Sequence, residues 1–153
     1  MPRFILLLHS NADAEAGKMP SEDEFLQMQA FNNELKKAGM LLSAEGLHAS
    51  SKGARVDFPP TDNSNPGKPG PKSDIRVTPG PFPIEGEHKL VCGLWIIKAE
   101  DLDEAVTWVK KAPITTSVEV RQIHELDDLK GVMPESMREE AQQFKDEQEG
   151  KRK

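Results

Sequence analysis

The amino-acid sequence predicts an α+β fold of the ferredoxin-like type, with βαββαβ order, an antiparallel sheet and two helices on one face. Three observations support this prediction. Apolar runs typical of strands alternate with segments whose apolar residues have helical spacing, in the order strand–helix–strand. The same order is repeated after a long intervening segment. Each helical segment starts with a residue pair that can cap it. The chain has 153 residues, which suits one domain with one core.

The first half begins with a strand and a helix. Residues 4–8, FILLL, form an apolar run that suits a buried strand and is too short for a secretion signal or a membrane span. A polar loop over 9–20 follows. Ser21 and Glu24 then form a capping box for an amphipathic helix over 22–38. The helical side chains expected to face the core are Phe31 and Leu35.

An excursion separates the two halves. A strand over 40–47 leads into it, and short strands are expected over 54–58 and 75–78. Five of the twelve prolines lie in residues 59–73, where they remove the backbone donors that regular structure needs. We expect this insertion to be an exposed loop that proteases cut easily.

The second half repeats the order of elements. LVCGLWII, residues 90–97, is the strongest strand pattern in the chain. Asp101 and Glu104 are expected to cap the next helix. Its buried stripe is expected to consist of Leu102, Ala105, Val106 and Val109. The last strand is expected over 117–123, where valines alternate with charged residues.

Residues 1–124 are therefore expected to form one domain, followed by a polar and partly helical extension over 125–153. The apolar anchors expected in this extension are Met137, Ala141 and Phe144.

A net charge of −6 disfavours nucleic-acid binding. Because Cys92 is the only cysteine, an intrachain disulfide and a cysteine zinc site are excluded. We expect a cytoplasmic protein with no membrane partner.

The strand patterns also predict a homodimer. A sheet with helices on one side only should alternate apolar and polar residues. The runs 4–8 and 90–97 do not alternate, so both of their faces are expected to be hidden from water. A second copy, placed sheet to sheet, is the simplest cover. The alternative covers are the C-terminal helix and the proline-rich loop, which are both too polar for this task.

Five stretches of the chain form an ordered set. They are FNNELKKAGMLLSAEGL (31–47), VTPGPF (77–82), the strand that contains Gly93, AEDLDEAVTWVKKAP (99–113) and SVEVRQI (117–123). This set resembles the YCII-related family of the DGPF type, and the resemblance implies a ferredoxin-like protomer that pairs as a dimeric α+β barrel. Where such proteins carry Asp-Gly-Pro-Phe, this chain has Pro79 in place of the aspartate. Chemistry that depends on that aspartate therefore does not transfer.

Candidate catalytic residues are few. The sequence has no phosphate-binding loop, no dinucleotide fingerprint, no nucleophile elbow and no histidine pair at metal spacing, so no metal or other cofactor is supported. His9 ends the first strand, where its imidazole could act as acid or base, or be a solvated loop residue. Glu45 lies in the second strand and could serve as a base, or point to water at an edge.

Successive side chains of a strand project to opposite faces of the sheet, and this alternation predicts a ligand-binding face. If the valines of the last strand pack against the helices, Glu119 and Arg121 lie on the opposite face. The arginine could clamp a carboxylate or phenolate, or the two charges could form an ion pair that stabilises the sheet. Trp95 and Phe82 could wall a pocket for a flat ligand, although a tryptophan in an apolar strand commonly packs in the core. The cavity expected on the helix-free face is lined by His9, Glu45, Trp95, Glu119 and Arg121 in some combination.

Two classes of function remain open from the sequence. The first is a cofactor-free enzyme, a lyase or isomerase that moves protons on a small cyclic or aromatic organic molecule, as the family resemblance implies. A cofactor-independent monooxygenase is an alternative enzyme, by analogy of fold. The second class is a non-catalytic ligand-binding or accessory dimer, which the missing aspartate at Pro79 favours.

Overall fold

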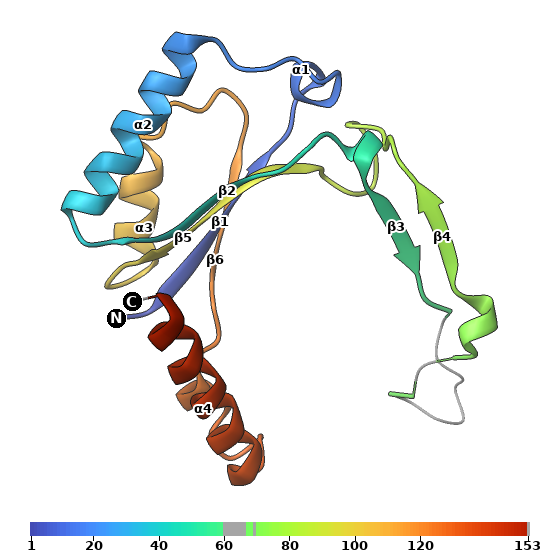
Figure 1. The fold of residues 1–153 in the computed structure, drawn as a ribbon, viewed down its shortest axis with the longest axis vertical. Helices are drawn as coiled ribbons and strands as arrows, with labels where there is room; N and C mark the ends of the chain where they lie inside the picture. Colours follow the sequence, from blue (N-terminus) through green and yellow to red (C-terminus); the bar gives the residue numbers. More distant parts are fainter. Residues whose placement is uncertain (60–66, 69, 153) are drawn as a thin grey trace.

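The computed structural model describes residues 1–59, 67–68 and 70–152. In chain order its strands and helices are β1 (Arg3–His9), α1 (Ala12–Glu15), α2 (Glu22–Lys37), β2 (Leu41–Gly46), β3 (Ala54–Asp57), β4 (Arg76–Pro79), β5 (Val91–Lys98), α3 (Leu102–Val109), β6 (Val118–Gln122) and α4 (Glu135–Arg152). Short 3-10 helices η1 (Ser50–Lys52), η2 (Lys72–Asp74) and η3 (Leu126–Leu129) lie between them. Figure 1 shows α2 and α3 on one side of the main sheet and the pair β3–β4 projecting on the other.

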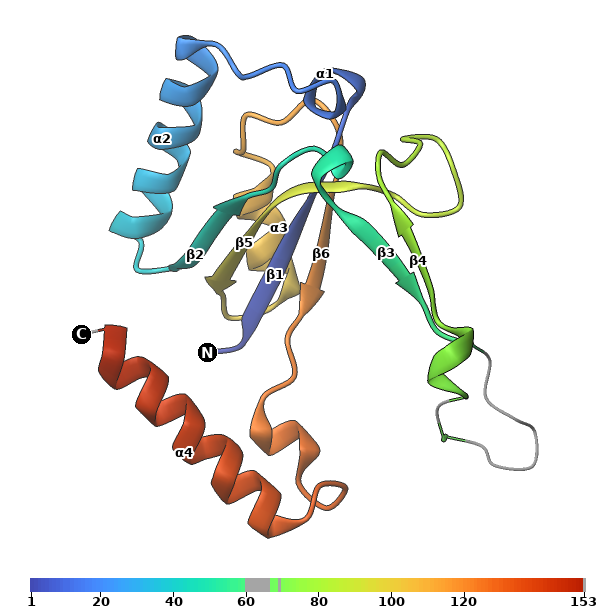
Figure 2. The same cartoon turned by 45° about the vertical axis from the view of Figure 1, so that its right-hand side comes forward.

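The main sheet has the strand order β2-β5-β1-β6, and every neighbouring pair is antiparallel. The strand nearest the N-terminus is therefore central. In the turned view α3 lies behind β1 and β6, and the side of the sheet away from α2 and α3 comes into sight (Figure 2). This arrangement confirms the predicted ferredoxin-like α+β fold.

Helix α2 follows the prediction closely. Ser21 Oγ accepts a hydrogen bond from the Glu24 backbone at 3.2 Å, and Glu24 Oε2 accepts one from the Ser21 backbone at 2.7 Å, so the capping box is present. Phe31 and Leu35 are buried, as predicted. The Phe31 ring meets Trp95 of β5 edge-on, with centroids 5.7 Å apart and an interplanar angle of 83°. These contacts attach α2 to the sheet.

Two segments differ from the sequence prediction. A short helix, α1, occupies part of the expected loop over 9–20, because the Asn11 side chain accepts a hydrogen bond from Ala14 N at 2.8 Å and caps it. In α3, Ala105 is fully buried, but Leu102 is 52% exposed. Its assignment to the buried stripe was wrong, because it is the first helical residue and lies at the outer end of that stripe.

The C-terminal helix α4 is attached by charge, and of the three predicted apolar anchors only Ala141 is half-buried. Arg3 Nε of β1 lies 2.6 Å from Glu125 Oε1, and Lys145 Nζ of α4 lies 3.5 Å from the other oxygen. The hydrogen bond from Arg3 holds the pKa of Glu125 below its usual range. Met137 and Phe144 are 53% and 62% exposed, so neither is an anchor.

No helix in the described part of the chain is long and apolar enough to cross a membrane.

Strands β3 and β4 form an antiparallel ribbon, which we call the arm. Val56 lies opposite Val77, and Arg55 lies opposite Thr78. Both predicted short strands are thus present. The proposed easily cut loop over 59–73 falls largely outside the described residues.

Strand register divides the side chains of the main sheet between two faces, because residues directly opposite one another project to the same side. On the helix side, Leu6 lies opposite both Trp95 and Val120 and belongs to the core. We call the other side the open face. Its members are Ile5, Leu7, Ser43, Glu45, Leu94, Ile96, Glu119 and Arg121. The four apolar residues at its centre are only half-buried in the single chain.

Candidate functional site

The end of β1 meets the starts of β5 and β6, and His9 lies at this junction. His9 N donates to the Ser117 carbonyl at 3.0 Å, and Thr116 Oγ1 donates to the His9 carbonyl at 2.9 Å. On the other side, Ser10 N donates to the Leu90 carbonyl at 2.9 Å. These bonds fix the backbone of His9 between its two neighbouring strands.

The imidazole of His9 is oriented by a hydroxyl. Its Nδ1 lies 2.6 Å from Ser117 Oγ, a hydrogen-bond distance. The strand register shifts between Leu8 and His9, so that His9 lies opposite Val91 and one residue of β5 is left over. Such a bulge re-aims the side chains at the end of a strand. The register shift and the hydroxyl together set the position of the ring.

A pocket of about 240 Å³ lies beside this imidazole. Its lining residues are His9, Ser10, Ile84, Lys89, Leu90, Thr116 and Ser117. The pocket lining thus combines three hydroxyls, an imidazole and one ammonium group with two aliphatic side chains. An imidazole with one nitrogen held by a hydroxyl can give or take a proton at the other nitrogen, and a lysine can hold an anion. The arrangement is suited to proton transfer on a small anionic molecule.

The structure places Glu45 away from this pocket. Its strand β2 is separated from β1 by β5, and Glu45 lies opposite Leu94, which in turn lies opposite Leu7. Two strand spacings amount to roughly 10 Å. Glu45 is exposed and belongs to the open face. His9 and Glu45, the two candidate catalysts, are therefore not brought into contact within one chain.

Glu119 and Arg121 lie on the open face, as strand parity predicted. Arg121 Nη1 is 4.0 Å from Glu119 Oε2, and the two side chains are 72% and 48% exposed. On β6 the alternate residues, Val118 and Val120, pack against the core. The charged pair occupies one edge of the open face and Glu45 the opposite edge, with the apolar centre between them.

Trp95 lies on the other face of the sheet. It is 5% exposed, packs against Phe31, and its Nε1 donates to Asn32 Oδ1 of α2 at 2.9 Å. The expectation that Trp95 lines a cavity on the helix-free face is therefore wrong. Because LVCGLWII is apolar at nearly every position, no alternation indicates which face of the sheet Trp95 occupies.

Phe82 lies at the base of the arm, and not among the residues that line the His9 pocket. Its backbone N donates to Ser50 Oγ at 2.9 Å, and the Arg55 guanidinium lies 4.0 Å from the centroid of its ring. Glu15 of α1 accepts hydrogen bonds from the backbone N and the hydroxyl of the same Ser50. Glu15, Ser50 and Phe82 thus join α1, η1 and the start of the segment that leads to Ile84.

Cys92 has no sign of nucleophilic activation. It is half-buried, and this burial raises the pKa of its thiol. A raised pKa lowers the fraction of reactive thiolate at neutral pH. In the described residues there is also no group of three or more histidine, cysteine, aspartate or glutamate side chains that could hold a metal ion.

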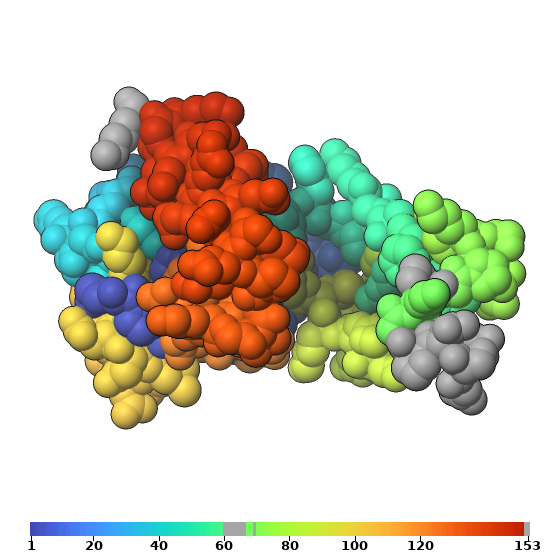
Figure 3. Space-filling model, turned by 90° about the horizontal axis from the view of Figure 1, so that it is seen from below, coloured from blue at the N-terminus to red at the C-terminus, as the bar shows by residue number. Residues whose placement is uncertain are grey.

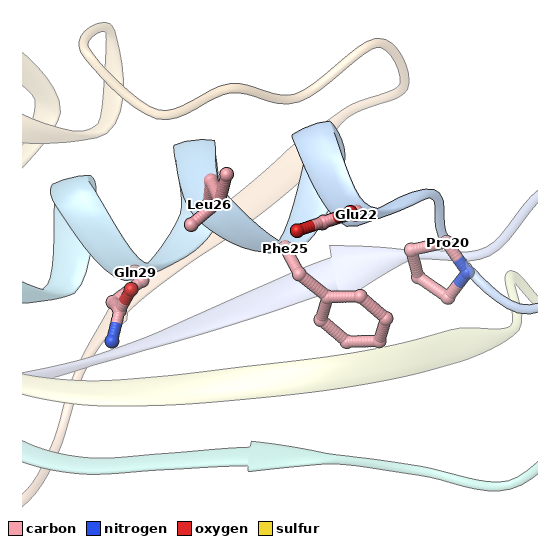
Figure 4. A pocket seen from close by; sticks show the side chains of 5 residues that line it. All are labelled: Pro20, Glu22, Phe25, Leu26 and Gln29. Carbon is pink, nitrogen blue, oxygen red and sulfur yellow. The ribbon is translucent and has the colours of Figure 1, made fainter.

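A second hollow lies on the outer surface of α2. Pro20, Glu22, Phe25, Leu26 and Gln29 line its volume of about 550 Å³ (Figure 4). Phe25 and Leu26 are 52% and 54% exposed, and Glu22 is the only charged residue of the five. This hollow offers an apolar contact surface without an acid–base pair, so the His9 pocket is the better candidate for chemistry.

Sequence reasoning found His9 and missed its companions. Thr116 directly precedes the predicted last strand and Ser117 begins it, and Lys89 precedes the strand over 90–97. The predicted topology contained a usable signal. In an antiparallel sheet with β1 in the centre, the end of β1 must lie beside the starts of both of its neighbours.

Comparison with known proteins gives one family. A family model described as the YCII-related domain matches residues 3–127, which is most of the chain and includes every element from β1 to β6. No curated protein matches the sequence.

Proposed function

The chain belongs to the YCII-related domain family, and on this basis we propose that it is a small-molecule-binding homodimer that acts as a cofactor-free lyase or isomerase. The proposed substrate is a small cyclic or aromatic organic acid, and the proposed reaction moves a proton. We assign the function to residues 1–124 and propose a cytoplasmic location. Residues 125–153 are proposed to be an extension attached through the Arg3–Glu125 ion pair.

One observation carries the proposal: the His9 imidazole, held by Ser117 Oγ at 2.6 Å, lines a pocket with a lysine. When Nδ1 donates to the hydroxyl, Nε2 is the basic nitrogen and can remove a proton from a bound molecule. Lys89 can then bind a carboxylate or an enolate oxygen that carries negative charge. A cavity of about 150 Å³ holds benzene, so a pocket of about 240 Å³ suits a molecule with a single ring.

Replacing His9 by asparagine is expected to lower turnover by about 10²–10⁴-fold, because a positioned acid or base contributes about this factor. Asparagine is polar and can still bond to Ser117, so ligand affinity should change little. A panel of single-ring carboxylic acids is first screened by thermal shift of the wild-type protein. Turnover of the binding compounds is then followed by proton NMR.

His48→Asn is the matched control for this experiment, because His48 is exposed and lies just after β2. It should leave turnover unchanged. Glu45→Gln is measured in parallel, since Glu45 remains the second proposed base and lies on the face that a partner would cover. Equal turnover in His9→Asn and the wild type would exclude His9 as the catalytic group.

The proposed homodimer uses the open face. Its centre, Ile5, Leu7, Leu94 and Ile96, is apolar and only half-buried in one chain, and charged residues lie at both edges. Two such faces related by a two-fold axis would cover one another's apolar centres. Polar and charged residues at the rim of an apolar centre are typical of protein interfaces.

Light scattering at micromolar concentration is expected to give about twice the single-chain mass of 17.0 kDa. Ile96→Asp should reduce this value toward 17.0 kDa, because it places an unpaired charge in the buried centre of the interface. Leu102→Asp is the control, since Leu102 is exposed on α3, a helix on the opposite side of the sheet. A wild-type mass near that of a single chain would contradict the homodimer.

The alternative function is a non-catalytic ligand-binding or accessory dimer. Pro79 stands where the family motif has an aspartate, so one potential proton carrier is absent from this chain. Ligands that bind in a His9- and Lys89-dependent manner without turnover would favour this alternative. Oxygen consumption with a bound phenol would instead favour a cofactor-independent monooxygenase.

A further inference from the structure

The His9 pocket has two halves that differ in how they are held. One half lies beside the end of β1 and the start of β6, and its residues are His9, Ser10, Thr116 and Ser117. In the other half, Ile84 and Lys89 come from residues 83–89, which we call the wall segment. Within the described residues, no backbone hydrogen bond joins the wall segment to the rest of the protein. Its position therefore depends on how its two ends are held.

Hydrogen bonds fix both ends of the wall segment. At the C-terminal end, Ser10 N donates to the Leu90 carbonyl at 2.9 Å and ties this end directly to the pocket. At the N-terminal end, the backbone N of Phe82 donates to Ser50 Oγ at 2.9 Å. Between these ends, residues 85–89 are exposed. Figure 3 shows the chain that follows β4, in yellow-green, at the surface between the arm and the C-terminal part of the chain.

The Ser50 hydroxyl that receives the Phe82 amide is itself held by Glu15. The backbone N of Ser50 donates to Glu15 Oε1 at 3.1 Å, and the hydroxyl donates to the other carboxylate oxygen. A hydroxyl whose own proton goes to a carboxylate presents its lone pairs to another donor, here the amide. Hydrogen bonds to a charged acceptor are also stronger than neutral ones. The carboxylate of Glu15 thus fixes the group that fixes Phe82.

Glu15 is attached at short range to the strand half of the pocket. It is the last residue of α1, and this helix begins two residues after Ser10. Asn11, between them, caps the helix through Ala14 N at 2.8 Å and accepts a hydrogen bond from Glu15 N at its carbonyl, at 3.0 Å. Figures 1 and 2 show α1 beside η1, the short turn that precedes β3. A closed path thus runs from the end of β1 through α1 and η1 to the wall segment and back to β1.

We propose that Glu15 is a positioning residue of the His9 pocket, which sets the place of Ile84 and Lys89 and thereby the size of ring that the pocket accepts. This inference rests on the proposed function and adds to it the selectivity for single-ring acids. Glu15 does not line the pocket, so its effect on a ligand is indirect. Without its carboxylate, fewer molecules hold the wall segment in the binding position, and the apparent affinity falls with that fraction.

The test measures binding of benzoate and 2-naphthoate, a one-ring and a two-ring carboxylate, by titration calorimetry. The wild type should bind benzoate more tightly, because a volume of about 240 Å³ suits one ring. Glu15→Ala should weaken benzoate binding by about tenfold to a hundredfold, since it removes hydrogen bonds to a charged group. 2-Naphthoate should lose less, because a displaced wall segment leaves more room. The ratio of the two affinities therefore falls, and this ratio does not depend on the folded fraction.

Ser50→Ala tests whether the effect passes through the hydroxyl. Because Glu15 and Ser50 act on the same Phe82 amide, the double variant should weaken benzoate binding about as much as Glu15→Ala alone, and not by the product of two losses. Glu15→Gln keeps one acceptor oxygen and should lie between Glu15→Ala and the wild type. Asp13→Ala is the matched control, because Asp13 is an acidic residue of the same helix that pairs with exposed Lys18 at 3.7 Å. It should leave both affinities unchanged.

The outcomes separate this inference from the function on which it rests. Unchanged benzoate affinity in Glu15→Ala, an unchanged affinity ratio, or multiplied losses in the double variant overturns the inference and leaves the proposed function intact. Lys89→Ala should also weaken benzoate binding, because its ammonium group is proposed to hold the carboxylate. If the wild type binds neither acid, or binds them independently of Lys89, the proposed ligand class is overturned together with the inference.

Discussion

Leu35→Ala is expected to lower the free energy of unfolding by about 2–5 kcal/mol. Leu35 is fully buried, in a core that includes Phe31, Trp95 and Ile97. Alanine would remove apolar surface from this core and leave a cavity that the sheet and α2 fill only in part. Urea unfolding followed by tryptophan fluorescence measures the loss. For a chain of about 150 residues, Tm should fall by about 2–4 °C per kcal/mol.

Leu26→Ala provides the same chemical change on the same helix at a site that is 54% exposed. Its effect is expected to stay within about 0.5 kcal/mol, as for most surface substitutions. Equal losses from the two variants would show that α2 does not pack through Phe31 and Leu35. The difference between them therefore measures core packing, with helix propensity held constant.

Gly80→Ala is expected to displace the base of the arm. An added Cβ would come within 1.7 Å of the Ser50 carbonyl oxygen and 2.6 Å of its carbon, both backbone atoms that cannot rotate away. Overpacking of this kind costs about 1–3 kcal/mol. The two hydrogen bonds at this junction, Gly80 N to Gly53 O and Phe82 N to Ser50 Oγ, should weaken. Hydrogen exchange at both amides should accelerate by about tenfold to a hundredfold.

Gly86→Ala is the comparison, because its Cβ would meet only Pro83 Cγ at 3.7 Å, an ordinary contact. Exchange at the Gly80 and Phe82 amides should be unchanged in this variant. If Gly80→Ala also left both amides protected, the close approach of Ser50 to Gly80 would not exist in solution.

Much of the fold could be predicted because local signals and packing agree. Ser21 and Glu24 cap α2 at the predicted place, and Phe31 and Leu35 face the core at helical spacing. The alternation on β6 was also informative, since its charged residues project from one side and its valines pack on the other. In each of these segments, apolar and polar residues repeat with the period of the helix or strand that the segment forms.

The predictions failed where the apolar pattern does not distinguish one side of a strand or helix from the other. The run over 90–97 is apolar on both sides, so no alternation could place Trp95 with the helices. Met137, Ala141 and Phe144 are predicted anchors because apolar residues are scarce in α4, but Met137 and Phe144 are exposed and the ion pairs of α4 come from its charged side chains. Scarcity of apolar residues says nothing about which side of a helix faces the domain.

Of the residues that line the candidate site, only His9 could be identified from the sequence. His9 could be singled out because an imidazole at a strand end is chemically distinctive. Ser117 and Lys89 have ordinary side chains, and they matter only because the fold brings them beside His9 from positions 108 and 80 residues away. Such proximity depends on the strand order, which local sequence patterns do not encode.

The central position of β1 also governs how the chain folds during synthesis. Both neighbours of β1 lie far along the chain, and β2 pairs with β5 as well. At about 5–20 residues per second, a ribosome needs roughly 4–16 s to make the segment between β1 and β5. During this interval the FILLL strand has two unpaired edges and no sheet to join. The sheet can therefore begin to form only after residues 91–98 emerge, and stalling before that point is expected to leave the FILLL strand open to aggregation.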